Sequence, residues 1–222
     1  GNGGGGGSTD DPNSDADGDG FTLAEEQAAG TNPDYIYSRP YTGGYNVGFC
    51  DTPPVPTGPI GEGSYDTYTW PTLATGDVPE NLTFMDQHGE AVDLYSFCGK
   101  HIMVVVSAGW CGPCRSLAAS TQEIQDTYRD DGLQIIEVIT ANNSYQRPNS
   151  PSEEFVADWA EQYSFDDIPV LAVPNWDQAS GNYNHPTFLF DNDSAIPSIY
   201  HLNEKMEVVS ADESIHDPGQ FL

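Results

Sequence analysis

A Cys-Gly-Pro-Cys sequence at residues 111–114 constrains this chain more than any other feature. It follows the apolar run 101–107, which predicts a buried strand, and precedes a helical pattern over residues 116–129. At a helix start the unpaired N–H groups and the helix dipole favour a thiolate at Cys111, and Cys114 lies one turn on. The pattern predicts a redox-active pair. A zinc site is disfavoured because the chain has no second CxxC or HxxxH pair, and a purely structural disulfide is the other alternative.

The charge of the chain argues against two classes of partner. There are 35 acidic and 6 basic residues among 222, which gives a net charge of −29. Nucleic acid and an anionic membrane surface would both be repelled by such a protein. No apolar run reaches 18 residues, so no membrane-spanning helix is predicted. We expect the acidic side chains to form a solvated surface.

The two remaining cysteines, Cys50 and Cys98, lie apart from the CxxC, and we expect them to form a structural disulfide in an oxidising compartment. Residues 1–12 are rich in glycine and predict a flexible tether. This tether resembles the segment after the lipidated cysteine of a bacterial lipoprotein. The resemblance implies an exported protein in the bacterial periplasm or at the cell surface, attached to the membrane only through an N-terminal lipid.

A calcium-loop pattern lies at residues 15–26, within a segment that we assign to residues 13–34. Acidic side chains stand at positions 1, 3 and 5, glycine at position 6 and glutamate at position 12. The segment resembles a single thrombospondin-type-3-like repeat more than a paired EF-hand, because no helix signal precedes it. The expected Ca²⁺ ligands are Asp15, Asp17, Asp19, the Phe21 carbonyl and Glu26. The alternative is an acidic disordered linker.

The rest of the chain divides into two parts. Residues 35–75 are rich in Tyr, Pro and Gly and predict an irregular extension that lies over the main domain. Residues 76–222 carry regular signals and form that domain. Its expected elements are a hairpin at 82–85 and 91–94, strands at 102–107, 133–139 and 168–173, helices at 116–129 and after a capping box at 150–153, and a hairpin at 198–202 and 206–209. This order predicts an α/β protein with a mixed central sheet flanked by helices.

Residues 76 to about 212 resemble a thioredoxin-fold domain of the TlpA/ResA-like (redoxin/AhpC-TSA) superfamily. The resemblance is carried by residues 76–84, 97–100, 110–115 and 196–198. It implies a thiol-disulfide oxidoreductase that acts on protein thiols and disulfides without an organic cofactor. By this resemblance Cys111 is the attacking thiolate and Cys114 the resolving one, and the substrate-binding residues are Trp110, Gly112, Pro113 and the dipeptide Ile196-Pro197.

The resemblance requires a cis-proline opposite the CxxC, and the sequence offers two. Pro197 is favoured because it leads into the terminal hairpin, and Pro186 is the alternative. Two carboxylates of related proteins are missing here. Val105 stands six residues before Cys111, where relatives often have a buried acid, and Leu117 stands where TlpA/ResA proteins often have glutamate.

Three other functions are weighed against the oxidoreductase. A copper-delivery protein of the same fold would use the two cysteines and a histidine such as His185, but those relatives space their cysteines by three residues. A peroxidase is disfavoured because Met103 and Ala108 do not match the Pro-x-x-x-Thr/Ser-x-x-Cys active site. The non-enzymatic alternative is a calcium-stiffened surface module whose CxxC is a structural remnant.

Overall fold

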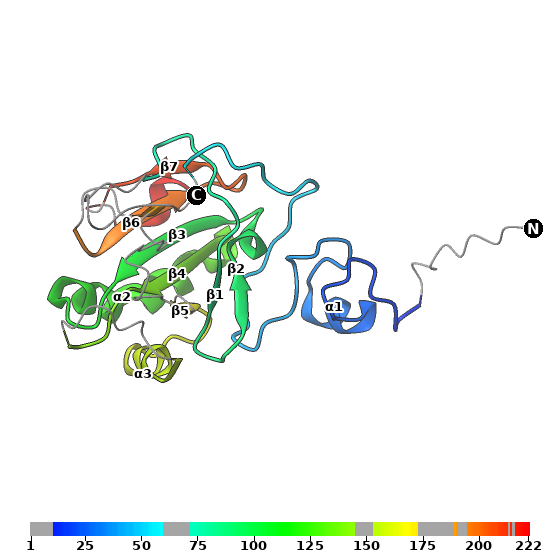
Figure 1. The fold of residues 1–222 in the computed structure, drawn as a ribbon, viewed down its shortest axis with the longest axis horizontal. Coiled ribbons are helices and arrows are strands. Elements are labelled where there is room, and N and C mark those ends of the chain that lie inside the picture. Colours follow the sequence, from blue (N-terminus) through cyan, green and yellow to red (C-terminus); the bar gives the residue numbers. More distant parts are fainter. Residues whose placement is uncertain are drawn as a thin grey trace, which may run out of the picture.

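A seven-stranded mixed sheet forms the centre of the molecule (Figure 1). The computed structural model describes residues 11–59, 72–144, 153–172, 189–190, 195–212, 214 and 216–222. The strands are β1 (Thr83–Met85), β2 (Ala91–Asp93), β3 (His101–Ser107), β4 (Leu133–Ile139), β5 (Val170–Ala172), β6 (Ser198–Leu202) and β7 (Val208–Ser210). They lie in the order β2-β1-β5-β4-β3-β6-β7.

The sheet is mixed because its central strands are parallel and its outer strands are antiparallel to their neighbours. Strands β3, β4 and β5 are parallel, whereas β1 pairs antiparallel with β2 and β5, and β6 pairs antiparallel with β3 and β7. The α/β thioredoxin fold that the sequence predicts is confirmed, and each expected strand is present within a few residues of its predicted bounds.

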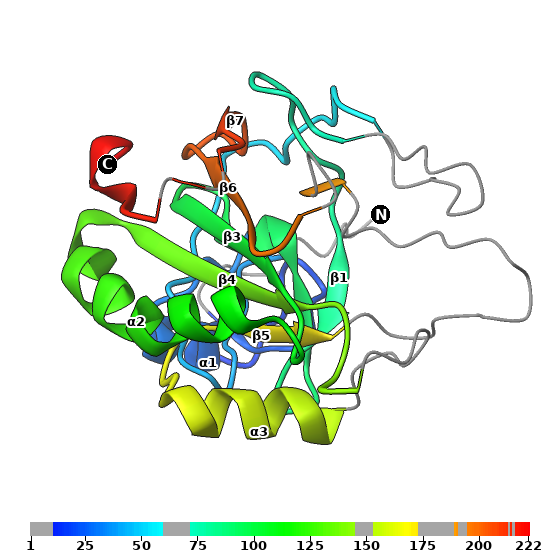
Figure 2. The same ribbon diagram turned by 90° about the vertical axis from the view of Figure 1, so that its left-hand side faces the viewer.

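Helices α2 (Gly112–Tyr128) and α3 (Glu153–Tyr163) cover one face of the sheet, as Figure 2 shows. Alternate residues of β3 and β4 point to this face because successive side chains of a strand alternate. They pack with the two helices in one apolar layer, which includes Met103, Val105, Ile135, Ile139, Leu117, Val156 and Trp159. Helix α2 begins at Gly112, four residues before the helical pattern of residues 116–129. Cys111, which the sequence places at the helix start, is its N-cap, and Pro113 fits the first turn.

The opposite face of the sheet packs against the N-terminal extension. Residues 35–59 form no helix or strand, yet Tyr35, Tyr41 and Tyr45 are buried against the other set of alternating strand residues. The short helix η2 (Leu94–Phe97) contributes to the same layer. A disulfide joins Cys50 to Cys98 directly after η2, as the sequence predicts.

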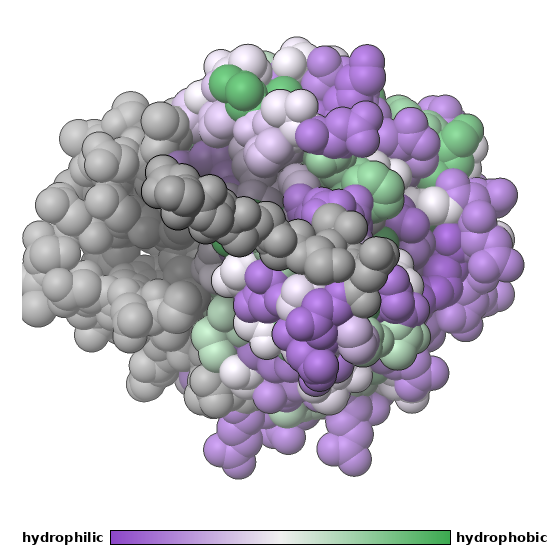
Figure 3. All heavy atoms as spheres, turned by 90° about the vertical axis from the view of Figure 1, so that its right-hand side faces the viewer, coloured by the Kyte–Doolittle hydropathy of each residue, from purple (hydrophilic) through white to green (hydrophobic). Residues whose placement is uncertain are grey.

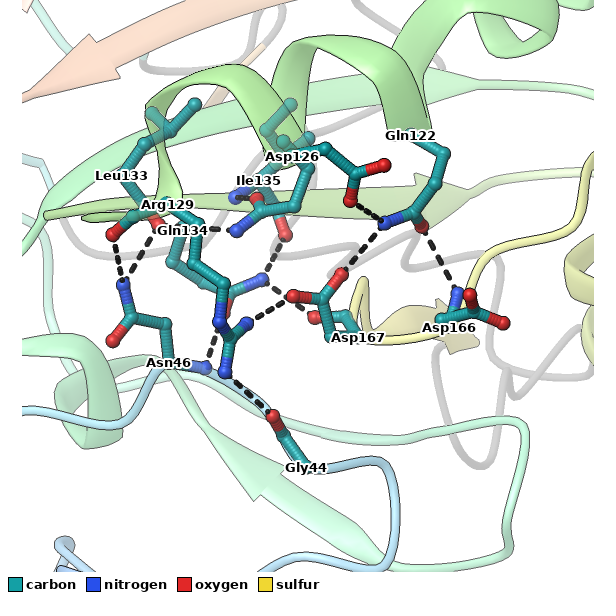
Figure 4. A network of polar contacts seen from close by, with 11 residues as sticks. Gly44, Asn46, Gln122, Asp126, Arg129, Leu133, Gln134, Ile135, Asp166 and Asp167 are labelled. Atoms are coloured by element: carbon teal, nitrogen blue, oxygen red, sulfur yellow. Dashed lines mark hydrogen bonds and ion pairs between the residues drawn. The ribbon is translucent and has the colours of Figure 1, made fainter. Parts of the chain in front are cut away.

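A network of polar contacts also fastens the extension to the domain (Figure 4). The guanidinium of Arg129 donates to the Gly44 carbonyl at 3.0 Å and forms an ion pair with Asp167. Asn46 donates through its backbone to the Gln134 side chain at 2.6 Å and through its amide to the Leu133 carbonyl at 3.0 Å. Because Leu133 and Gln134 lie at the start of β4, the extension is held at the amino-terminal end of this central strand.

The described side chains on the face that carries helix α1 (Leu23–Ala29) are mostly hydrophilic, as Figure 3 shows. This agrees with the solvated acidic surface expected from the net charge of −29. Within the described residues, no helix is both long and apolar enough to cross a membrane.

Candidate active site

The two CxxC cysteines meet at the N-terminus of α2. They form a disulfide, and Cys111 and Cys114 are 3% and 0% exposed. The backbone N–H of Cys114 donates to the Cys111 sulfur at 3.1 Å, which makes Cys111 the N-cap of a 17-residue helix. When the pair is reduced, this N–H and the helix dipole stabilise a thiolate at Cys111. Cys114 lies inside the first turn, shielded from solvent.

The loop before Cys111 is fixed by close backbone contacts. Gly109 donates to the Ala141 carbonyl at 2.8 Å, and Arg115 returns from α2 to donate to the Gly109 carbonyl at 2.8 Å. A Cβ atom at Gly109 would lie 2.5 Å from the Phe155 ring, so no other residue fits there without displacement. These contacts position Cys111, and sequence reasoning did not single out Gly109 or assign Arg115 a role.

A cis peptide bond joins Ile196 to Pro197, opposite the CxxC. The Ile196 carbonyl oxygen lies 3.5 Å from the Cys111 sulfur. The bond directly precedes β6, whose Ser198 pairs with Val106 of β3, so the sheet itself holds the cis-proline beside the cysteines. The sequence favours this position, and its alternative, Pro186, lies outside the described residues.

A groove of about 540 Å³ lies between the first turns of α2 and the cis-proline. It is lined on one side by Pro113, Ser116 and Leu117 of α2 and on the other by Ile196 and Pro197. His216 of the C-terminal segment also lines it, although the sequence assigned no role to this residue. Leu117 gives the groove an apolar wall.

Three of the predicted calcium ligands meet in space at the other end of the molecule. One carboxylate oxygen from each of Asp15, Asp17 and Asp19 lies within 4.8 Å of the others, and among the described residues this is the metal-ligand cluster that stands out. Gly20 has a φ of +97°, which lets its N–H point back to Asp15 at 3.2 Å. The position of the Phe21 carbonyl as a ligand stays a prediction.

Glu26 is aimed into this acidic cluster from α1. Its side chain is fully buried, and its Oε2 atom has no hydrogen-bond partner among the described residues. Burial and the charges of Asp19 and Asp17 raise the pKa of Glu26 to about 7. The neighbouring Glu25 has a different task, because it closes a capping box with Thr22. A buried carboxylate among three others is a suitable ligand set for a divalent cation. The charge of the cation would offset the cost of burying the Glu26 carboxylate.

The Redoxin family model matches residues 74–206, which is more than half of the chain. The chain belongs to the Redoxin family. The match spans the CxxC, the cis-proline and six complete strands, so the predicted family is confirmed on the part of the chain that contains the site.

Curated relatives match this redoxin over part of their length. Nucleoredoxin of Homo sapiens is 30% identical over 155 residues, which cover 62% of this chain and 32% of that protein. Nucleoredoxin of Mus musculus is 31% identical over 124 residues, which cover 48% of this chain and 25% of that protein. This redoxin therefore spans about a third or less of the curated proteins that it resembles.

Solved structures share the fold at low sequence identity. A candidate thiol:disulfide interchange protein DsbE from Chlorobium tepidum aligns with a TM-score of 0.50 at 16% identity, over 68% of this chain and 95% of that one. The thioredoxin domain of a thiol-disulfide oxidoreductase from Bacteroides vulgatus aligns with a TM-score of 0.49 at 19% identity, over 68% and 98%.

One ionisable residue near the site was missed from the sequence. Val105 and Leu117 are apolar and buried, as expected, but Glu137 of β4 is the direct strand partner of Val105. It is 1% exposed, and burial raises its pKa to about 8. A signal was available, because Glu137 is the charged residue in the middle of the otherwise buried strand 133–139.

Proposed function

We propose that this redoxin is an extracytoplasmic thiol-disulfide oxidoreductase that exchanges the Cys111–Cys114 disulfide with cysteines of protein substrates. One observation carries the proposal: Cys111 caps a helix and lies 3.5 Å from the carbonyl that precedes a cis-proline. A thiolate-stabilising position and the backbone carbonyl before the cis-proline therefore stand side by side. The family and the groove between α2 and the cis-proline support the same function.

The reaction divides into two exchanges. In the reducing direction, the Cys111 thiolate attacks a substrate disulfide, so that one substrate sulfur leaves as a thiolate and the other is bound to Cys111. Cys114 then loses its proton and attacks the Cys111 sulfur, which forms the Cys111–Cys114 bond and releases the second substrate thiolate. The backbone of Ile196 can pair with the substrate chain in strand fashion and hold its sulfur over Cys111.

The extracytoplasmic location is supported by cysteine chemistry. The Cys50–Cys98 disulfide lies far from the CxxC and ties the extension to the domain, which is a structural use of cysteine. Structural disulfides persist in oxidising compartments. Export and attachment through an N-terminal lipid remain parts of the proposal.

Reduction of insulin disulfides by dithiothreitol tests the proposed activity. We expect this redoxin to accelerate precipitation of the insulin B chain, and Cys111→Ser to act no faster than dithiothreitol alone. The reduction potential of the Cys111–Cys114 pair then gives the direction of exchange, with values near about −270 mV typical of reductases and near about −120 mV of oxidases. If the wild-type protein shows no acceleration and Cys111 binds copper(I) tightly, the copper-delivery alternative replaces the oxidoreductase.

We propose in addition that residues 15–26 bind one structural Ca²⁺ ion. The observation that favours it is the buried, unpartnered Glu26 oxygen among three aspartates. Calcium would be held by carboxylate oxygens of Asp15, Asp17, Asp19 and Glu26. Asp19 also lies within electrostatic reach of Arg39, which bonds to Ala91 of β2 and contacts Asp93 at 3.6 Å. An ordered loop would thus stiffen the attachment of the N-terminal segment to the sheet.

Calorimetric titration with CaCl₂ tests the loop. We expect one equivalent to bind and to raise the melting temperature, because a ligand that binds only the folded state stabilises it. Glu26→Gln should weaken binding about tenfold or more, since it removes a charged bidentate ligand. Glu25→Gln is the matched control, because glutamine can keep the capping box. Absence of binding heat at millimolar Ca²⁺ would leave the loop a purely acidic turn.

A further inference from the structure

We infer that Glu137 is the buried acid that exchanges a proton with Cys114, and that it replaces from strand β4 the carboxylate that related proteins carry on strand β3. The inference rests on the proposed oxidoreductase function and adds the residue that holds the proton. It explains how a redoxin can work with Val105 and Leu117 at the two positions where acids are expected.

Strand register places Glu137 on the correct face. Val105 and Glu137 are paired in the parallel β3–β4 ladder, so their side chains point to the same side of the sheet. Their neighbours Met103 and Ile135 pack in the apolar layer beneath α2 and α3. Adjacent strands lie about 4.8 Å apart, so Glu137 stands one strand away from the family's usual acid position and at the same depth.

A small polar cluster surrounds the Glu137 carboxylate. Ser107 lies two residues beyond Val105 on β3 and so faces the same side, closer to the CxxC. Burial raises the pKa of Glu137, and the Ser107 hydroxyl lies close enough to lower it in part. Neither Glu137 oxygen has a hydrogen bond of normal geometry to a described residue, and the same holds for the Ser107 hydroxyl. Three buried polar atoms without described partners are costly in a core, which is typical of a functional site.

The charged and titratable groups around Glu137 are few. On α3, burial raises the pKa of Tyr163; the charge of Arg115 from α2 lowers this pKa, and the charge of Glu137 raises it. From β5 the partner of Glu137 is the apolar Val170. From α2, Tyr128 also packs against this apolar layer, and the CxxC cysteines lie at the start of the same helix. With the pair oxidised, no described cation neutralises Glu137 at hydrogen-bond distance, so it holds a proton at neutral pH.

In this inference Glu137 accepts a proton when the Cys111–Cys114 disulfide forms and donates one when that disulfide is reduced. When Cys114 attacks the mixed disulfide, its proton passes to the Glu137 carboxylate, with the Ser107 hydroxyl as the nearest relay. When the Cys111–Cys114 bond is reduced, the protonated Glu137 returns that proton to the Cys114 sulfur. A group that titrates near pH 8 can do both, because general acids and bases work best when their pKa lies near the working pH.

Glu137→Gln tests the inference, with Glu123→Gln of the exposed face of α2 as the matched control. The release of substrate from the preformed Cys111 mixed disulfide is followed by stopped-flow fluorescence between pH 6 and 9. We expect Glu137→Gln to slow this step about tenfold to a hundredfold and to remove an inflection near pH 8. Formation of the mixed disulfide should not change. Glu137→Asp, which keeps an ionisable group, should restore part of the rate and an inflection.

A second readout separates this inference from the proposed function. Equilibration with dithiothreitol gives the reduction potential of the Cys111–Cys114 pair at each pH without any protein substrate. The curves of wild type and Glu137→Gln should diverge between pH 7 and 9, while Glu123→Gln follows wild type. Parallel curves, or equal slowing of both exchange steps, would overturn the role of Glu137. Failure of insulin reduction alone would overturn only the proposed activity.

Discussion

Replacing Cys114 with serine is expected to stop turnover and leave this redoxin covalently bound to its substrate through Cys111. The variant keeps the attacking thiolate at the N-cap of α2 but loses the thiol that resolves the mixed disulfide. Turnover should fall at least about a thousandfold, because a missing nucleophile cannot be replaced by a neighbouring group. Non-reducing electrophoresis with a disulfide-containing protein should show up to one equivalent of adduct, which dithiothreitol removes.

Two control variants show whether the covalent adduct forms specifically through Cys111. Cys111→Ser should form no adduct, because the remaining Cys114 is 0% exposed and cannot reach a substrate sulfur. The pair Cys50→Ser/Cys98→Ser should keep turnover, because that disulfide is structural and lies on the other layer of the core. An adduct that forms equally well in Cys111→Ser would reverse the roles assigned to the two CxxC cysteines.

The fold could be predicted from the sequence because its strong signals are local. The apolar strands 101–107 and 133–139 and the CxxC between strand and helix each fix an element without reference to the rest of the chain. The start of α2 is local as well, because the CxxC places Cys111 at the helix N-terminus, although the regular helical pattern begins only at residue 116.

Only part of the site could be predicted from the sequence. The cysteines and the dipeptide Ile196-Pro197 could be named because each has a short motif, and the structure places the Cys111 sulfur 3.5 Å from the Ile196 carbonyl oxygen. Glu137 could not be linked to them, because its relation to Val105 depends on which strands pair and in which register. The same holds for Gly109, whose need for a glycine comes from the Phe155 ring. Contacts between elements distant in sequence leave no periodic signal.

The oxidised protein is expected to lose stability between about pH 5 and pH 8, and Glu137→Gln is expected to remove much of that loss. The folded state raises the pKa of Glu137 from 4.5 to about 8. Below pH 4.5 the group is protonated whether the chain is folded or unfolded, so it makes no difference. As the pH rises further, the unfolded chain releases the proton and the folded protein keeps it, which favours unfolding by about 1.4 kcal/mol per pH unit. The total by pH 8 is about 3–5 kcal/mol.

Urea denaturation of both proteins from pH 4 to 8.5 measures this effect. The difference in unfolding free energy between Glu137→Gln and wild type isolates Glu137 from other acids, such as Glu26, whose pKa is also raised. We expect this difference to be constant below pH 4.5, to grow in favour of the variant up to about pH 8, and then to level off, since Glu137 ionises in the folded state as well. A residue kept at such a cost at working pH serves the exchange of protons rather than the stability of the fold. Parallel curves over the whole range would show instead that Glu137 is ionised in the folded protein and that its burial is compensated.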